Sequence, residues 1–240
     1  MPFDNVYEDA RRAEAYAKLE FPGTYYLAYR DLPKIISEQT SGKRALDFGC
    51  GTGRSTRFLK NLGFEVVGVD ISEDMLRQAR SADPLGDYQL IPDNGSVPIA
   101  SPSFDLALAI FTFDNIPTRE KKVALFRELR RLVAPNGKIV TLMSSPEIYT
   151  HEWASFTTRD FPENRLAKSG DLVRIIMTDV EDRRPVEDII WFDDAYRDVF
   201  RASDLDLLSA HHPLGLNSEP YRWVTETQVS PWVIYVLTPR

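Results

Sequence analysis

The glycine-rich stretch at residues 44–53 constrains the fold of this 240-residue chain more than any other feature. It begins as a short apolar segment that ends in an acid, Asp47, and it continues at once into three alternating glycines. A helix-compatible run over 55–62 follows, and then a second apolar segment, 66–69, that ends at Asp70. A strand, a glycine turn, a helix and a second strand tipped with an acid form one half of a nucleotide-binding α/β fold.

The spacing of the glycines discriminates between nucleotide-like ligands. A dinucleotide fingerprint needs Gly-x-Gly-x-x-Gly, whereas Gly49, Gly51 and Gly53 alternate and Arg54 stands three residues after Gly51. The third glycine is therefore misplaced for a pyrophosphate cradle, which disfavours a nicotinamide oxidoreductase. Asp47 also places negative charge near the strand end, where it suits a cationic group better than a diphosphate. These features favour S-adenosylmethionine, which has an ammonium, a sulfonium and a ribose but no phosphate.

Three segments together resemble those of a known family. Residues 46–53 (Leu-Asp-Phe-Gly-Cys-Gly-Thr-Gly), 67–72 (Val-Gly-Val-Asp-Ile-Ser) and the pair Met75 and Leu76 resemble the class I S-adenosylmethionine-dependent methyltransferases. The resemblance covers about residues 40–145 and weakens on both sides. It implies methyltransferase activity, S-adenosyl-L-methionine as the cofactor, and a sheet of order 3-2-1-4-5-7-6 with an antiparallel seventh strand.

Strands and helices alternate along the chain, which predicts a mostly parallel sheet covered on both faces. We expect a Rossmann-like, doubly wound α/β fold. Strands are expected at 44–47, 66–69, 87–91, 104–111, 138–143, 171–179, 186–192, 205–210 and 232–237. Helices are expected at 5–20, 25–37, 55–62, 73–80, 119–134 and 193–200.

The expected organisation is one domain with four parts. Residues 1–40 form a helical N-terminal lid, 41–145 the cofactor-binding core, 146–200 an inserted substrate-side region with a small antiparallel pair, and 201–240 the strands that complete the sheet. The lid segment is rich in tyrosine, which either lines a pocket or packs onto the sheet. Aromatic residues of the insertion either roof an acceptor pocket or form a dimer surface: Trp153, Phe156, Phe161, Trp191, Phe192 and Tyr196.

Composition narrows the classes of partner. The 29 basic and 36 acidic residues give a net charge of −7, and the longest basic clusters are pairs such as Lys121 and Lys122, interpreted as solvated helix faces. A nucleic-acid partner is therefore not expected. The lone Cys50 excludes an intrachain disulfide, and no signal peptide, membrane span or zinc-ligand spacing is recognisable. We expect a cytoplasmic monomer or homodimer that uses no metal and acts on a small molecule.

The first expected cofactor contacts come from the two acid-tipped strands. Asp70 is expected to accept hydrogen bonds from the ribose hydroxyls, and Gly49 and Gly51 to bring their backbone against the methionine portion of the ligand. Asp47 either orients the ammonium group, directly or through water, or caps the following turn.

The resemblance implies further contacts with the adenine. Asp93 would accept a hydrogen bond from the adenine amino group and the amide of Asn94 would meet the ring, unless both belong to an ordinary turn. Met75 either packs on the adenine or belongs to the core, and Phe111 ends the fourth strand. The complete expected cofactor set is Asp47, Gly49, Gly51, Gly53, Asp70, Ile71, Met75, Asp93, Asn94 and Phe111.

Candidate catalytic residues follow three of the later strands. Asp114 comes after the fourth strand, where relatives often carry histidines, and would orient a cationic acceptor or take a proton. His151 follows the fifth strand and His211 the sixth, and histidine suits general-base work near neutral pH. Each of the three also has a purely structural interpretation. Oxygen, nitrogen and carbon acceptors all stay open, as do an RNA or protein methyltransferase and a non-catalytic cofactor-binding subunit.

Overall fold

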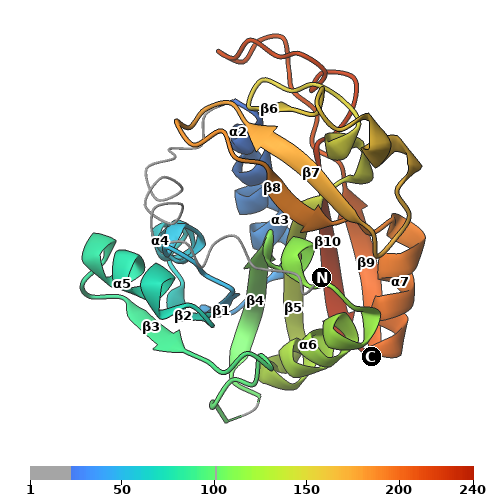
Figure 1. Cartoon of the computed structure of the whole chain (residues 1–240). Helices are drawn as coiled ribbons and strands as arrows, with labels where there is room; N and C mark the ends of the chain where they lie inside the picture. Colours follow the sequence, from blue (N-terminus) through green and yellow to red (C-terminus); the bar gives the residue numbers. More distant parts are fainter. Residues whose placement is uncertain (1–22, 101) are drawn as a thin grey trace.

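The computed structural model describes residues 23–100 and 102–240, and its core is a seven-stranded sheet (Figure 1). In sheet order the strands are β3 (Asp87–Leu90), β2 (Glu65–Asp70), β1 (Arg44–Phe48), β4 (Phe104–Ile110), β5 (Val133–Ser144), β10 (Trp232–Pro239) and β9 (Leu205–His211). The first five are parallel, and β10 runs antiparallel to both of its neighbours. This order and these directions confirm the Rossmann-like sheet expected from the resemblance.

Helices cover both faces of the sheet because successive strand residues point to opposite sides. On one face α2 (Thr24–Arg30), α3 (Leu32–Gln39) and α4 (Arg54–Asn61) pack against Ala45 and Leu106. On the other face α6 (Arg119–Leu132) and α7 (Asp193–Ala202) pack against Leu46 and Ala107. Helix α5 (Glu73–Ala82) buries Leu76 and Ala79 in a smaller cluster with Cys50 and Tyr88.

The N-terminal part differs from expectation in one described element. A single helix over 25–37 is expected, but the chain forms α2 and α3 with a break at Asp31. Pro33 stands within the first turn of α3, where its missing N–H costs no hydrogen bond, whereas inside one continuous helix it would remove a bond. The helix expected over 5–20 and the aromatic residues Tyr7, Tyr16 and Phe21 lie outside the described residues.

Strand β5 also begins earlier than expected. The sequence predicts a helix over 119–134 and a strand from 138, but α6 ends at Leu132 and pairing with β4 starts at Val133. The register passes from Phe104 opposite Val133 to Leu106 opposite Lys138, so residues 135–137 bulge out within the strand.

A small antiparallel sheet lies across the carboxyl ends of β4 and β5 (Figure 1). It consists of β6 (Phe156–Thr157), β7 (Leu172–Met177) and β8 (Val186–Ile189), so the expected inserted pair gains a third strand. Three short 3-10 helices, η2 (Thr112–Asn115), η3 (Pro146–Tyr149) and η4 (Pro162–Leu166), belong to the connections near this sheet. The insertion therefore covers the sheet edge at which parallel α/β folds bind their ligands.

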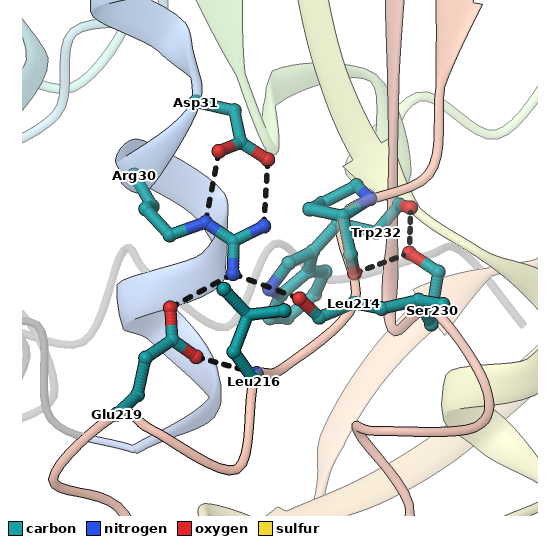
Figure 2. A network of polar contacts seen from close by, with 8 residues as sticks. Arg30, Asp31, Leu214, Leu216, Glu219, Ser230 and Trp232 are labelled. Atoms are coloured by element: carbon teal, nitrogen blue, oxygen red, sulfur yellow. Dashed lines mark hydrogen bonds and ion pairs between the residues drawn. The ribbon is translucent and has the colours of Figure 1, made fainter.

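The connection 212–231 between β9 and β10 is fixed to α2 by a polar network (Figure 2). Arg30 donates to the carbonyl of Leu214 at 2.8 Å and to the carboxylate of Glu219 at 2.9 Å, and it also pairs with Asp31. Glu219 in turn accepts from the amide of Leu216 at 2.7 Å. None of the helices in 23–100 and 102–240 is both long and apolar enough to cross a membrane.

Candidate cofactor cleft and acceptor pocket

The glycine turn after β1 is crowded at Gly49 and Gly53 and open at Gly51. Gly49, Gly51 and Gly53 have φ values of 73°, 52° and 75°, in the left-handed region that other residues rarely adopt. A Cβ on Gly49 would lie 2.5 Å from the Thr112 side chain, and one on Gly53 would lie 2.5 Å from the Tyr88 hydroxyl. A Cβ on Gly51 would meet no described atom within 4 Å. The turn thus presents open backbone surface at Gly51.

Asp70 connects the end of β2 to this turn. Its Oδ2 accepts a hydrogen bond from the amide of Gly51 at 2.8 Å, and its Oδ1 accepts from the amide of Ser72 at 2.9 Å. The side chain is half-buried, and burial raises the pKa of the carboxyl. Each carboxylate oxygen retains a second lone pair, which fits the two hydroxyl donors of a ribose.

Asp47 lies deeper, fully buried beneath the turn. Its Oδ2 accepts from the hydroxyls of Ser55 at 2.7 Å and Thr56 at 2.5 Å, both in the first turn of α4. Its Oδ1 is buried and has no hydrogen-bond partner in the described part of the chain. Burial raises the pKa of this carboxyl to about 6. A buried carboxylate oxygen without a donor fits a ligand that supplies an ammonium group.

The other predicted cofactor residues lie in several environments. Ile71, next to Asp70, is partly exposed, whereas Met75 is buried, so its side chain packs in the interior. Asp93 and Asn94 are exposed in the turn after β3, and the Asn94 side chain accepts from the amide of Ser96 at 3.0 Å. The structure thus bonds Asp70 to the glycine turn and Asp47 to the start of α4, which follows the turn. The adenine roles of Met75, Asp93 and Asn94 stay predictions.

Phe111 lines a pocket, and the next residue, Thr112, lies beside the glycine turn, where its hydroxyl donates to the carbonyl of Phe48 at 2.9 Å. Phe111 follows β4 directly and has a φ of 59°, which is unusual for a bulky residue. The pocket holds about 430 Å³ of empty space, part of it open to solvent. Its lining comes from the ends of β4 and β5, the small sheet, α2 and β10: Tyr25, Phe111, Asp114, Asn115, Ser144, Ile148, Tyr149, Phe156, Ile175, Val186, Asp188 and Trp232.

Acidic and neutral polar groups face one side of this pocket. Asp114 is 5% exposed, and its carboxylate accepts from the amide of Ser144 at 3.0 Å. Asp188 is 8% exposed and accepts from the hydroxyl of Tyr149 at 3.0 Å. The Oδ1 of Asn115 is buried with no partner among the described residues. Burial raises the pKa of Asp114, so this carboxylate is a stronger proton acceptor than an exposed one.

Lys122 lies behind the pocket wall, which corrects the interpretation of the Lys121 and Lys122 pair as a solvated helix face. Lys122 is fully buried, donates to the carbonyl of Phe113, and has its Nζ 5.0 Å from the ring centroid of Trp191 and 5.2 Å from that of Tyr196. Burial lowers the pKa of this ammonium. Because Lys122 precedes the core residue Phe126 by one helical turn, its place on the apolar face was readable from the sequence.

The candidate catalytic residues separate in the structure. Asp114 lines the pocket, whereas His151 and His211 are absent from its lining in the described part of the chain. The Nδ1 of His151 lies 3.0 Å from the carbonyl of Glu147, and the Nε2 of His211 lies 2.9 Å from the Ser209 hydroxyl on β9. Catalytic roles for all three residues stay predictions.

The pocket residues that the sequence analysis does not identify as functional include Asp188, Tyr149 and Trp232. Of these, Asp188 could have been identified from the sequence. It lies two residues after Val186 and therefore on the same buried face of a short strand. A carboxylate on an apolar strand face indicates either a buried partner or a ligand. Tyr149 and Trp232 come from distant segments, and their convergence depends on the fold.

Comparison with known proteins gives this arrangement a family. Residues 46–141 match the family described as methyltransferase domain. The chain is 26% identical over 208 residues to N-demethylindolmycin N-methyltransferase of Streptomyces griseus, covering 85% of this chain and 86% of that enzyme. It is 35% identical over 104 residues to demethylmenaquinone methyltransferase of Tropheryma whipplei (strain Twist), covering 42% of this chain and 41% of that enzyme.

A solved structure of an S-adenosylmethionine-dependent methyltransferase from Clostridium acetobutylicum ATCC 824 shares the fold. Its TM-score is 0.61 at 14% identity, over 93% of this chain and 94% of that one. The sheet order, the open glycine turn and the two acids define a Rossmann-like nucleoside-binding protein. The methyltransferase-domain match over 46–141, the methyltransferase relatives and this shared fold together support a class I S-adenosylmethionine-dependent methyltransferase with S-adenosyl-L-methionine as its cofactor.

Proposed function

We propose that this methyltransferase acts on a small-molecule acceptor held in the pocket beside Phe111. The observation that supports this most directly is the pocket itself, which is lined by residues of the small sheet, α2 and the start of β10. A pocket of about 430 Å³ with a mainly aromatic and aliphatic lining, part of it open to solvent, suits a small ligand better than an extended polymer. The names of two relatives, an N-demethylindolmycin and a demethylmenaquinone methyltransferase, agree with a small acceptor.

The chain's own residues divide the work between the two sites. The backbone at Gly51 and the carboxylates of Asp47 and Asp70 hold the cofactor, which supplies an activated methyl group on a sulfonium when bound. The aromatic wall of the pocket excludes water and positions the acceptor, because alignment is the main requirement of an in-line displacement. Asp114 orients the acceptor or removes its proton. The acidic chain with a single cysteine agrees with a cytoplasmic enzyme.

Three measurements test this proposal together. Isothermal titration is expected to show S-adenosylmethionine binding, and a panel of small acceptors is expected to yield methylated product with matching S-adenosylhomocysteine release. A mobility-shift assay with RNA at low salt is expected to show no binding, since phosphate-driven affinity is greatest there. Methyl transfer to RNA or protein in preference to every small acceptor would contradict the proposal. Cofactor binding without any turnover would instead identify a non-catalytic subunit.

A further inference from the structure

We propose that the methyl acceptor is a small amine that the pocket binds as its ammonium form, between an aromatic box and the carboxylate of Asp114. This inference rests on the proposed function, since it names the class of acceptor for the same pocket. Two independent properties of the lining carry it: the packing of four aromatic rings, and the sign of the charge next to them.

Four aromatic side chains enclose one end of the pocket: Tyr25, Phe111, Phe156 and Trp232. The ring centroid of Trp232 lies 4.8 Å from that of Phe111 and 5.9 Å from those of Tyr25 and Phe156. The Tyr25 centroid lies 5.1 Å from that of Phe156 and 6.1 Å from that of Phe111. The rings contact one another, mostly edge to face or tilted, so they form one packed aromatic wall of the pocket, which we call the aromatic box. The ring faces that such a wall turns to the pocket attract ammonium groups through their quadrupoles.

The polar part of the same lining is acidic. Asp114 and Asp188 face the pocket, and no lysine, arginine or histidine belongs to the lining in the described part of the chain. Asp114 makes no ion pair among the described residues, and its only described hydrogen-bond donor is Ser144. A buried carboxylate without an ion-pair partner is costly, and a cationic ligand in the pocket would relieve part of that cost.

Lys122 does not remove this charge from the pocket. It lies behind the lining, where its Nζ donates to the carbonyl of Phe113 and lies 3.4 Å from the hydroxyl of Tyr196. No ion pair joins it to Asp114 or Asp188 within 23–100 and 102–240, although it is near enough to favour the ionised form of Asp114. Its place leaves the carboxylate face of Asp114 to a ligand in the pocket.

The chemistry of an amine acceptor balances in this pocket. Asp114 accepts one proton from the ammonium, which frees the nitrogen lone pair. That lone pair forms the new N–C bond as the S–C bond of the sulfonium breaks and its electron pair stays on sulfur. The product nitrogen then carries the positive charge, and the aromatic box and Asp188 surround it. No oxidant, reductant or metal is needed.

The test compares matched amines and alcohols by binding, independently of turnover. The protein is saturated with S-adenosylhomocysteine and titrated with linear, branched and aromatic amines, each paired with the alcohol of the same carbon skeleton, and with tetramethylammonium as a probe of the box alone. Ligand-observed NMR detects weak binding. We expect the best amine to bind at least about tenfold more tightly than its alcohol, and tetramethylammonium to displace it.

Two variants separate the charge from the box. Asp114→Asn is expected to reduce the amine preference about tenfold or more, and Phe156→Leu to weaken tetramethylammonium about tenfold while keeping apolar bulk. The matched control is Asp160→Asn, which removes one exposed carboxylate from the same insertion and is expected to change neither. Unchanged S-adenosylhomocysteine affinity verifies that each variant is folded.

Equal affinities for amines and alcohols across the panel would overturn the inference, as would equal effects of Asp114→Asn and Asp160→Asn. Turnover of hydroxyl acceptors in preference to amines would also overturn it while leaving the proposed small-molecule function intact. Failure of the proposed function would be visible separately, as methyl transfer only to a polymer or as no transfer at all.

Discussion

At the scale of single residues, two acids at neighbouring strand ends have different environments. Asp70 is half-buried and accepts from two backbone amides, so its carboxylate is held at the open surface of the glycine turn. Asp47 is fully buried and bonded to two hydroxyls of α4. The first is therefore placed at the surface of the turn, where a ligand would contact it, and the second keeps one buried oxygen, Oδ1, for the ammonium group of a ligand.

Replacement of Asp70 tests the ribose contact. Asp70→Asn keeps the size of the side chain but removes the charge and one of two acceptor oxygens. We expect the affinity for S-adenosylhomocysteine, measured by isothermal titration, to fall by about one to two orders of magnitude, because hydrogen bonds to a charged group contribute roughly 1.5–3 kcal/mol. Asp87→Asn, an exposed change at the start of β3, should leave the affinity unaltered. An unchanged affinity in the Asp70 variant would exclude this role.

The pKa of Asp47 predicts a pH dependence of stability. The folded-state pKa is raised from 3.8 to about 6, so the folded protein binds this proton more tightly than the unfolded chain. The sign follows: this group favours folding below its unfolded pKa, and that contribution is lost as pH rises through about 6.

Asp47→Asn should abolish this dependence. From pH 4 to pH 7, the free energy of unfolding of the variant should rise relative to that of the wild type by roughly 2 kcal/mol. The full shift corresponds to about 1.4 kcal/mol per pKa unit, and part of it is already lost at pH 4. Urea denaturation at several pH values measures the difference, and Asp87→Asn serves as the control. A difference that is flat with pH would contradict the assignment.

At the scale of elements, helix α2 is fixed at both ends to segments far away in sequence. At its start, the buried carboxylate of Glu226 accepts from the Thr24 hydroxyl at 2.6 Å and from the Ala154 amide at 2.7 Å. Its second oxygen accepts from the amides of Val224 and Thr225. At its end, Arg30 reaches Glu219 (Figure 2). These bonds hold Tyr25 in the pocket wall.

The two glutamates should contribute unequally to stability. In Glu226→Gln, an N–H donor replaces a carboxylate oxygen that accepts hydrogen bonds inside the protein. We expect the free energy of unfolding to fall by roughly 2–3 kcal/mol. Glu219→Gln, at the more exposed end, should cost about 1 kcal/mol or less. Guanidinium denaturation of both variants provides the comparison. Similar losses would mean that burial does not distinguish the two contacts.

At the scale of the whole molecule, the cofactor half of the architecture could be predicted from the sequence. The alternation of strands and helices and the acid-tipped strands are local patterns, and the resemblance supplied the sheet order. The acceptor pocket could not be predicted in the same way. Its walls come from α2, β4, β5, the insertion and β10, and only the finished topology brings Tyr25, Asp188 and Trp232 together. The interpretation of the Lys121 and Lys122 pair also missed the burial of Lys122, since the side chains of a basic pair usually lie in solvent.

The free energy of unfolding of the whole molecule should depend on which cofactor is added. S-adenosylmethionine at about a hundred times its dissociation constant should raise the free energy of unfolding by about 2.7 kcal/mol. The midpoint of thermal unfolding is expected to rise accordingly, while NAD at the same concentration leaves it unchanged. Stabilisation by NAD instead would point to a phosphate site in the glycine turn.

Phe111 gives the two compartments a shared wall. Its backbone ends β4 in a left-handed conformation beside the cofactor side, while its ring forms part of the acceptor box. A ligand in one compartment that holds Phe111 in place would also favour binding in the other compartment. Binding of the cofactor and of the acceptor should therefore be cooperative. Thermodynamic reciprocity then requires that the acceptor tighten the grip on the nucleoside by the same factor by which the nucleoside tightens the grip on the acceptor.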